Sequence, residues 1–532
     1  MQRRDFLKAA ATSGGLTILR SGLLRGDTAP SKRLNIALVG VWGRGTAHYN
    51  VMLKENVVAL CDINDLRTKE GLEVFPKAKV YSDWRRMLDQ KDVEAVIICS
   101  ADHHHAFIAN WAMNRGMHVY CEKPMGITVD EVRTLRATYL KNRGKIATQH
   151  GTQRHAYPNF ERLRELVLDG AVGDLKTVYG WDSRQLPRPG YPQGEGMVPA
   201  SLHYEQWIGP SPYHPYSPQY FGGASGMNCI FWNMYRDFGV GQMGDMGAHT
   251  MDLLWNAIDA GAPTAIEVDQ EVSDKFNPNI TPVKLKVSFD HPANQWRGPI
   301  TVVWYQGGLK PNPPKDYINI QKIGNGVIFE GTKGSILADF TTRTIIPNND
   351  DGDLTYYKHR SKSDVLPLIE GTGQVTQGSP RPKTQVAHNA PPLPPGFTAW
   401  PNPEPQANGF PVIQFTQNGL PAALGMPNTD VQQILEAEKE GRAPNLGGSL
   451  FQLDWIDACK GKNNAETHGT SSKTHCDFDY SGSMMEQMLL GLVAHQAGKR
   501  LEYDPATGRI TNDATANDWL KRSYRKGWTL NG

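Results

Sequence analysis

The chain has 532 residues, too many for one ordinary hydrophobic core, so we expect at least two domains. Hydrophobic residues make up 39% and charged residues 21%, which is typical of a soluble globular protein. The formal net charge is only +2 and no long block of Lys and Arg occurs, which argues against a nucleic-acid partner. Six cysteines in a chain of this length are too few for a disulfide scaffold.

The N-terminus carries the pattern of a targeting segment. Arg3 and Arg4 precede Asp5-Phe6-Leu7-Lys8, and a modestly apolar stretch follows over residues 9–19. This pattern predicts that residues 1–30 are a twin-arginine export signal and that the protein is periplasmic. An ordinary frayed terminus is the alternative. No other segment approaches the length needed to span a bilayer, so we expect no membrane span in the mature form.

Residues 31–150 alternate short apolar runs with helix-like stretches. Continuously apolar strands are typical of a parallel sheet that is covered on both faces. We therefore predict an α/β protein whose N-terminal domain is a Rossmann, doubly wound parallel sheet. The expected strands are residues 35–39, 57–61, 95–99, 118–121 and 145–148.

The pattern changes after residue 150. An expected helix over 160–168 is followed by several strand-like runs, and the chain returns to helix over 482–496. We predict a C-terminal α+β domain over 151–532 with a largely antiparallel sheet. Residues 349–447 are crowded with Pro, Asn, Gly and Gln and indicate a long irregular insertion. The expected strands are residues 175–181, 284–289, 300–305 and 327–329.

A glycine cluster, Gly40-Val41-Trp42-Gly43-Arg44-Gly45, follows the first expected strand. Such glycines permit a tight turn and close helix packing, and the helix N-terminus then faces a dinucleotide pyrophosphate. Trp42 stands where the motif normally has its middle glycine, which weakens it. Asp62 ends the next strand, where a carboxylate binds the adenosine ribose and repels a 2′-phosphate, so NAD is favoured over NADP. A helix cap is the alternative for Asp62, although Asp65 suits that role equally well.

Two further clusters carry groups for proton transfer. Glu122-Lys123-Pro124 ends a strand, where ligands bind in open α/β sheets, and Lys123 there can hold a substrate hydroxyl. Asp245 and His249 lie four residues apart on one face of a helix that begins near Gly244. That pair suits substrate binding and proton transfer. A surface lysine, a capping Asp and a packed His are the structural alternatives, and a metal site lacks a convincing third ligand nearby.

In this order and spacing the clusters resemble the Gfo/Idh/MocA oxidoreductases, which include glucose-fructose oxidoreductase and inositol dehydrogenase. Ser100-Ala101-Asp102-His103 and residues 327–334 add to the likeness, which spans residues 34–334 and resumes near the C-terminus. The resemblance implies an open-faced second sheet that mediates homo-oligomers. It also implies Lys123 and His249 as the catalytic pair, supported by Asp245. The remaining implied contacts are Ser100, Asp102, His103 and Glu122 for NAD and Arg154 for substrate.

Two groups of residues leave alternatives open. Because consecutive helix residues point about 100° apart, His103, His104 and His105 do not converge easily on one ion. We expect no metal there, with Asp102 capping the helix and His103 near the cofactor. Trp232, Tyr235 and Arg236 either line a sugar pocket or pack beside the active-site helix.

Together these features predict an exported NAD-dependent oxidoreductase that acts on a sugar or polyol. His249 accepts the hydroxyl proton while Lys123 holds the oxygen. Free NAD is scarce outside the cytoplasm, so we expect the cofactor to stay bound. One alternative is an NAD-dependent glycosidase that works by transient oxidation and elimination. A non-catalytic sugar-binding or scaffold protein is the other, and the intact Lys123, Asp245 and His249 argue against it.

Overall fold

The computed structural model describes residues 33–348, 448–462 and 473–531, apart from 195, 222–230, 317 and 341. The expected export signal (1–30) lies outside the described residues. So does the expected insertion (349–447), except for five short strands, β14 to β18. Across the described residues, no helix is long and apolar enough to cross a membrane. The five strands are Phe397–Ala399, Glu404–Pro405, Pro411–Val412, Phe415–Gln417 and Leu420–Pro421.

The N-terminal domain is the predicted Rossmann sheet. Its six strands are all parallel and lie in the order β3-β2-β1-β4-β5-β6, the order of a doubly wound dinucleotide-binding fold. The sixth strand begins at Thr148 and not at Lys145, because residues 142–146 form a turn. The strands are β1 (Asn35–Val39), β2 (Asn56–Cys61), β3 (Lys79–Tyr81), β4 (Ala95–Ile98), β5 (His118–Cys121) and β6 (Thr148–His150).

Both faces of this sheet are covered. Along β1, Ala37 and Val39 face one hydrophobic core, and Ile36 and Leu38 face another. The first core contains α5 (Asp102–Asn114) and α6 (Val129–Lys141). The second receives Phe451 and Trp455 from the distant helix α14 (Gly448–Cys459). Near-continuous apolar strands are required because each strand is buried on both sides.

The second domain is built on a nine-stranded sheet with the order β13-β12-β11-β7-β10-β9-β8-β19-β20. Neighbouring strands are antiparallel except β7 and β10, which are parallel, so the sheet is mixed but mostly antiparallel as predicted. The strands are β7 (Leu175–Asp182), β8 (Ala265–Val268), β9 (Leu285–His291), β10 (Ile300–Gln306), β11 (Asn325–Gly331), β12 (Gly334–Ala338), β13 (Arg343–Pro347), β19 (Leu501–Asp504) and β20 (Arg509–Ile510).

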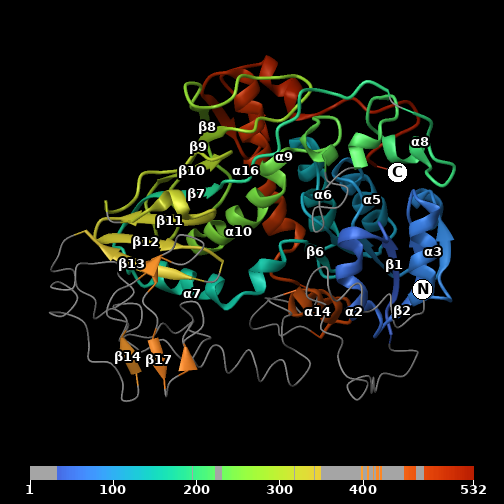
Figure 1. The fold of residues 1–532 in the computed structure, drawn as a ribbon, viewed down its shortest axis with the longest axis horizontal. Coiled ribbons are helices and arrows are strands. Elements are labelled where there is room, and N and C mark those ends of the chain that lie inside the picture. The colour runs from blue at the N-terminus through green and yellow to red at the C-terminus, as the bar shows by residue number, and fades with distance from the viewer. Residues whose placement is uncertain are drawn as a thin grey trace.

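Three helices join this sheet to the Rossmann domain: α7 (Pro158–Leu168), α10 (Met246–Ile258) and α16 (Phe478–Ala497). Figure 1 shows the blue Rossmann sheet and the yellow second sheet, with α10 and α16 between them. This arrangement brings the N-terminal end of α10 to the carboxyl ends of the Rossmann strands.

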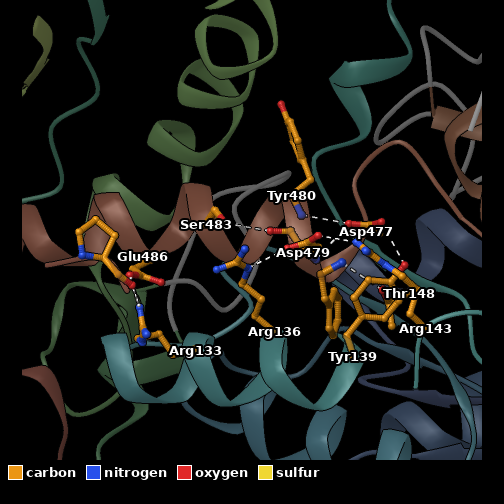
Figure 2. A network of polar contacts seen from close by, with 12 residues as sticks. Arg133, Arg136, Tyr139, Arg143, Thr148, Asp477, Asp479, Tyr480, Ser483 and Glu486 are labelled. Atoms are coloured by element: carbon orange, nitrogen blue, oxygen red, sulfur yellow. Dashed lines mark hydrogen bonds and ion pairs between the residues drawn. The ribbon is translucent and has the colours of Figure 1, made fainter. Parts of the chain in front are cut away.

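Polar contacts fix α16 against α6, as Figure 2 shows. Arg133 donates to Glu486 at 2.7 Å, and Tyr139 donates to Asp477 at 3.0 Å. Asp479 accepts from Arg136 at 2.8 Å and also pairs with Arg143. The Glu486 side chain is only 1% exposed. A buried carboxylate must be paired to be tolerated, so this contact locks the register of the two helices.

Candidate functional site

The glycine turn has the geometry that a dinucleotide turn requires. Gly40 has φ +81°, and a Cβ at Gly40 would lie 2.4 Å from the carbonyl oxygen of Cys99. A Cβ at Gly45 would lie 2.0 Å from the carbonyl oxygen of Gly40. Gly43 also has positive φ, +60°. The first glycine therefore permits the turn, and the last permits close packing of the helical segment η2 (Gly43–His48).

Asp62 braces this turn from the end of β2. Its Oδ2 accepts a hydrogen bond from the Val41 N–H at 2.8 Å, and its Oδ1 accepts from the Asn64 N–H at 2.9 Å. Each oxygen retains a lone pair for a ribose hydroxyl. Asn64, not Asp62 or Asp65, caps α3 (Asp65–Val74), because its side chain accepts from the Leu66 N–H.

Trp42 lies at the rim of the turn. The Arg67 guanidinium stacks over its ring at 3.9 Å from the ring centroid. The side chain that interrupts the glycine motif is therefore held against α3.

Glu122, at the end of β5, joins the glycine turn to the centre of the sheet. Its Oε1 accepts from Arg44 at 2.8 Å and from His48 at 3.0 Å. Burial alone would raise the pKa of Glu122, but the Arg44 charge and the His48 hydrogen bond lower this pKa to about 2. The other oxygen, Glu122 Oε2, is buried without a hydrogen-bond partner. The hydroxyl of Ser100, shortly after the end of β4, is also buried without a partner. Unpartnered buried polar atoms at these strand ends fit a polar ligand such as NAD.

Lys123, Asp245 and Arg184 form an ion cluster. Asp245 lies between α9 (Gly241–Gly244) and α10, and its carboxylate pairs with the Lys123 ammonium and the Arg184 guanidinium. Burial opposes the charge, but these two cations hold the pKa of Asp245 below its usual value. The structure thus places Lys123 and Asp245, two of the predicted catalytic residues, in direct contact. Sequence reasoning missed Arg184, which follows β7 in an irregular segment without any motif.

His249 is a neutral, buried imidazole in α10. Burial, together with the nearby charges of Arg154 and Lys123, lowers its pKa well below the usual value. Its Nδ1 is buried without a partner. His249 therefore has a ring nitrogen available as a proton acceptor at neutral pH.

Two residues at and after the end of β6 approach the same region. Arg154 stacks on Phe340 at 4.2 Å and interacts electrostatically with Asp245. His150, which sequence reasoning missed, is fully buried with both ring nitrogens unpartnered, and burial lowers its pKa to about 4. A strand-end position was the signal that could have found it.

The start of α5 corrects one prediction. Asp102 does not cap the helix: Ala101 is the N-cap, in extended conformation, and Asp102 is the first helical residue. Asp102 is buried, and it interacts electrostatically with Lys123 and Asp245. His103 packs against the second domain, 2.7 Å from the carbonyl oxygen of Trp207.

The two following histidines also contact carbonyl groups. His104 donates to the Trp207 carbonyl at 2.8 Å. His105 lies between the carbonyl oxygens of Ser100 (2.8 Å) and Pro124 (2.6 Å), so it ties together the loops that follow β4 and β5.

Trp232, Tyr235 and Arg236 make the contacts of packed residues. Trp232 and Tyr235 are 7% and 2% exposed and belong to an aromatic cluster around Trp207. Arg236 donates through Nε to the carbonyl oxygens of Asn277 (2.8 Å) and Ile280 (3.0 Å). Of the two alternatives, these contacts favour packing beside the active-site helix.

Comparison with known proteins identifies both domains. Residues 34–150 match the description "Oxidoreductase family, NAD-binding Rossmann fold", and residues 176–289 match "Oxidoreductase family, C-terminal alpha/beta domain". Both stretches thus match models of the Gfo/Idh/MocA oxidoreductase family. The predicted nicotinamide-binding fold is confirmed by the first match.

Curated relatives include the inositol 2-dehydrogenase of Salmonella paratyphi B. It is 29% identical over 175 residues, which cover 32% of this chain and 52% of that protein. A glycosyl hydrolase family 109 protein of Stenotrophomonas maltophilia is 32% identical over 149 residues, covering 25% of this chain and 31% of the relative. The chain thus spans about half the length of the first curated relatives it matches.

Solved structures share the fold. An oxidoreductase domain protein from Kribbella flavida superposes with a TM-score of 0.51 at 17% identity, covering 88% of this chain and 99% of that one. The WlbA dehydrogenase from Bordetella pertussis, solved with NADH and UDP-GlcNAcA, has a TM-score of 0.51 at 12% identity, covering 89% and 98%.

Proposed function

We propose that this protein is an NAD-dependent oxidoreductase that acts on a hydroxyl-bearing carbon of a sugar or polyol and keeps its cofactor bound between half-reactions. The observation that carries the proposal is a neutral, buried His249 with an unpartnered ring nitrogen in the same region as the Lys123–Asp245–Arg184 ion cluster. Catalytic groups of this kind, at the carboxyl ends of Rossmann strands, suit removal of a hydroxyl proton.

In the mechanism, the His249 imidazole accepts the substrate hydroxyl proton. The Lys123 ammonium donates a hydrogen bond to the same oxygen and stabilises the negative charge that develops there. Asp245 holds Lys123 in place, and Arg184 holds Asp245 from the other side. Bound NAD supplies the hydride acceptor.

The residues around the glycine turn fit that cofactor. The turn from Gly40 to Gly45 leaves room for a pyrophosphate close to the backbone, and Asp62 faces the turn with free lone pairs. The unpartnered Ser100 hydroxyl and Glu122 Oε2 offer polar contacts at the strand ends.

A segment of the second domain supports cofactor retention. We define residues 183–221 as the crossing segment. It contacts the Rossmann domain at Ile63 and Asp65, directly after Asp62. The Asp65 N–H donates to the Ser201 carbonyl at 2.9 Å, and the His203 N–H donates to the Ile63 carbonyl at 2.7 Å. Figure 1 shows α8 (Tyr204–Ile208), a helix of this segment, beside α3. The chain therefore crosses the edge where Asp62 would hold the adenosine ribose.

Export belongs to the same proposal. Arg3 and Arg4 stand in a twin-arginine pattern, and that route carries folded proteins. NAD bound before export would have to be retained afterwards, which agrees with the covering role of the crossing segment.

The test is mass spectrometry and absorbance on the purified, undialysed protein. We expect bound NAD, and we expect reduced-nicotinamide absorbance to rise when the right member of a sugar and polyol panel, inositol included, is added. Lys123→Met should retain NAD but lose this rise. Absence of bound NAD, together with failure of added NAD to bind, would refute the proposal. Release of an aglycone without net NADH would instead indicate the glycosidase alternative.

A further inference from the structure

A second cluster of reactive side chains lies beneath the site, where three distant segments meet. His155 lies in η3 (Gln153–Ala156), Asp252 lies in α10, and Cys476 immediately precedes the N-cap of α16. One ligand atom from each residue lies within 4.8 Å of the other two. The three residues are 6%, 0% and 0% exposed. None of them has a role in the proposed hydride transfer.

The donor set is one that zinc prefers. Imidazole nitrogen, carboxylate oxygen and thiolate sulfur bind Zn²⁺ tetrahedrally, with donors about 3.3–3.6 Å apart for ordinary bond lengths. His155 Nδ1 already lies 2.9 Å from Asp252 Oδ1. All three donors lie within 4.8 Å of one another, close to the spacing that one ion requires.

Outer hydrogen bonds hold two of the donors in place. The Tyr480 hydroxyl donates to Asp252 Oδ1 at 2.7 Å, and the Thr152 hydroxyl donates to the Cys476 sulfur at 3.4 Å. Metal-binding carboxylates and thiolates in proteins usually receive such support from residues around them.

The charge of this cluster favours a cation. Asp252 is fully buried, and the ion pair it makes within the described chain is with His155 and not with a lysine or arginine. In the comparable group of His48, Cys99 and Glu122, the Glu122 carboxylate already pairs with the permanent positive charge of Arg44. Of the two groups, the one around Asp252 is therefore the site for a divalent ion.

We propose that His155, Asp252 and Cys476 form a structural zinc site. The fourth ligand is a water molecule or the ring of His475, whose centroid lies 5.8 Å from that of His155. Asp252 lies three residues after His249 in α10, and His155 follows Arg154 directly. Zinc would therefore fix the catalytic helix and the Arg154 loop against the C-terminal segment.

Elemental analysis of the purified full-length protein is the first test. We expect about one zinc per chain in the wild type, and loss of nearly all of it in Cys476→Ser and Asp252→Asn. Cys459→Ser is the matched control, because Cys459 is also a free cysteine but belongs to neither donor group. Circular dichroism checks folding, and Asp252→Asn keeps the thiol if Cys476→Ser fails to fold.

Cobalt provides the second test, because Co²⁺ bound to a thiolate gives a charge-transfer absorption band. Chelator-treated wild type should take up Co²⁺ with this band, as should Cys459→Ser and Cys99→Ser, whereas Cys476→Ser should not. Wild type without bound metal and without a cobalt–thiolate band would overturn the proposal. Loss of the band in Cys99→Ser but not in Cys476→Ser would overturn it as well, since the metal would then lie beside Glu122. Neither test requires the oxidoreductase activity.

Discussion

Replacing Asp245 with asparagine isolates the charge on which the proposed site depends. The carboxylate lies between Lys123 and Arg184, and the three side chains are 12%, 20% and 32% exposed. Asparagine keeps the size and can still precede α10, but it removes the negative charge. Lys123 and Arg184 then lose the carboxylate that pairs with both of them.

The magnitude follows from this burial. Removing one partner of a fully buried ion pair costs about 3–5 kcal/mol, whereas exposed pairs contribute about 0–1 kcal/mol. The Asp245 cluster lies between these limits and closer to the buried one, so we expect the free energy of unfolding to fall by about 2–3 kcal/mol. Because Lys123 loses the group that orients it, hydride transfer should slow by roughly 10²–10³-fold.

Urea denaturation measures the first effect, and single-turnover reduction of bound nicotinamide measures the second. Asp182→Asn is the matched control. Asp182 is buried nearby and accepts from the Arg184 backbone N–H at 2.9 Å, but burial raises its pKa and it forms no ion pair with Lys123. The reasoning is refuted if Asp245→Asn loses less than about 0.5 kcal/mol and keeps its rate. Equal losses in both variants would refute it too.

Three further predictions concern the glycine turn, the buried His150 and Arg522 near the C-terminus. Gly45→Ala should abolish NAD binding measured by calorimetry, because the added Cβ would lie 2.0 Å from a backbone oxygen of the turn. Gly261→Ala is the control and should bind NAD normally, because a Cβ at Gly261 would have no neighbouring atom within 4 Å. Burial lowers the pKa of His150 to about 4, so the unfolded chain binds a proton that the native state does not, and the free energy of unfolding should fall as the pH drops from about 6.5 to 4. His150→Gln should show a shallower fall in urea titrations across this range, and an unchanged slope would contradict the assignment. Arg522→Gln should lower the free energy of unfolding by about 3 kcal/mol, because it leaves the fully buried Glu131 without its cation. The same variant should lose NAD faster during dialysis. Unchanged NAD retention would disprove the link between Arg522 and the cofactor.

Local patterns were sufficient to predict the Rossmann domain. The central strands are buried on both faces, so apolar residues run continuously, as in residues 95–98, and mark the strand without any knowledge of its neighbours. The glycine turn is equally local, since Gly40 and Gly45 are required by backbone contacts within or beside the turn. Short edge strands such as β3 escaped prediction because their side chains are largely exposed and show no apolar run.

The site was only partly predictable, because several of its contacts join residues far apart in sequence. Lys123 and Asp245 were assigned to one site only through a family resemblance, because no spacing rule connects residues 122 positions apart. Arg184 lies outside any motif, and only the fold reveals that it reaches the site, whereas His150 had its position at a strand end as a signal. Asp102 was misassigned as a cap because an aspartate before an apolar helix is the usual N-cap, whereas here the helix begins one residue earlier.

The contacts of Arg522, near the C-terminus, support the proposal that NAD stays bound between half-reactions. Arg522 donates to Glu131 of α6 at 2.7 Å, to the His103 carbonyl of α5 at 2.9 Å and to the Ser211 hydroxyl of the crossing segment at 3.0 Å. One side chain thus ties two Rossmann helices to the segment that passes over the end of β2. Opening that edge requires these contacts to break together with the backbone bonds at Ile63 and Asp65. For NAD bound at this edge, as proposed, exchange should therefore be slow relative to exchange of a small sugar.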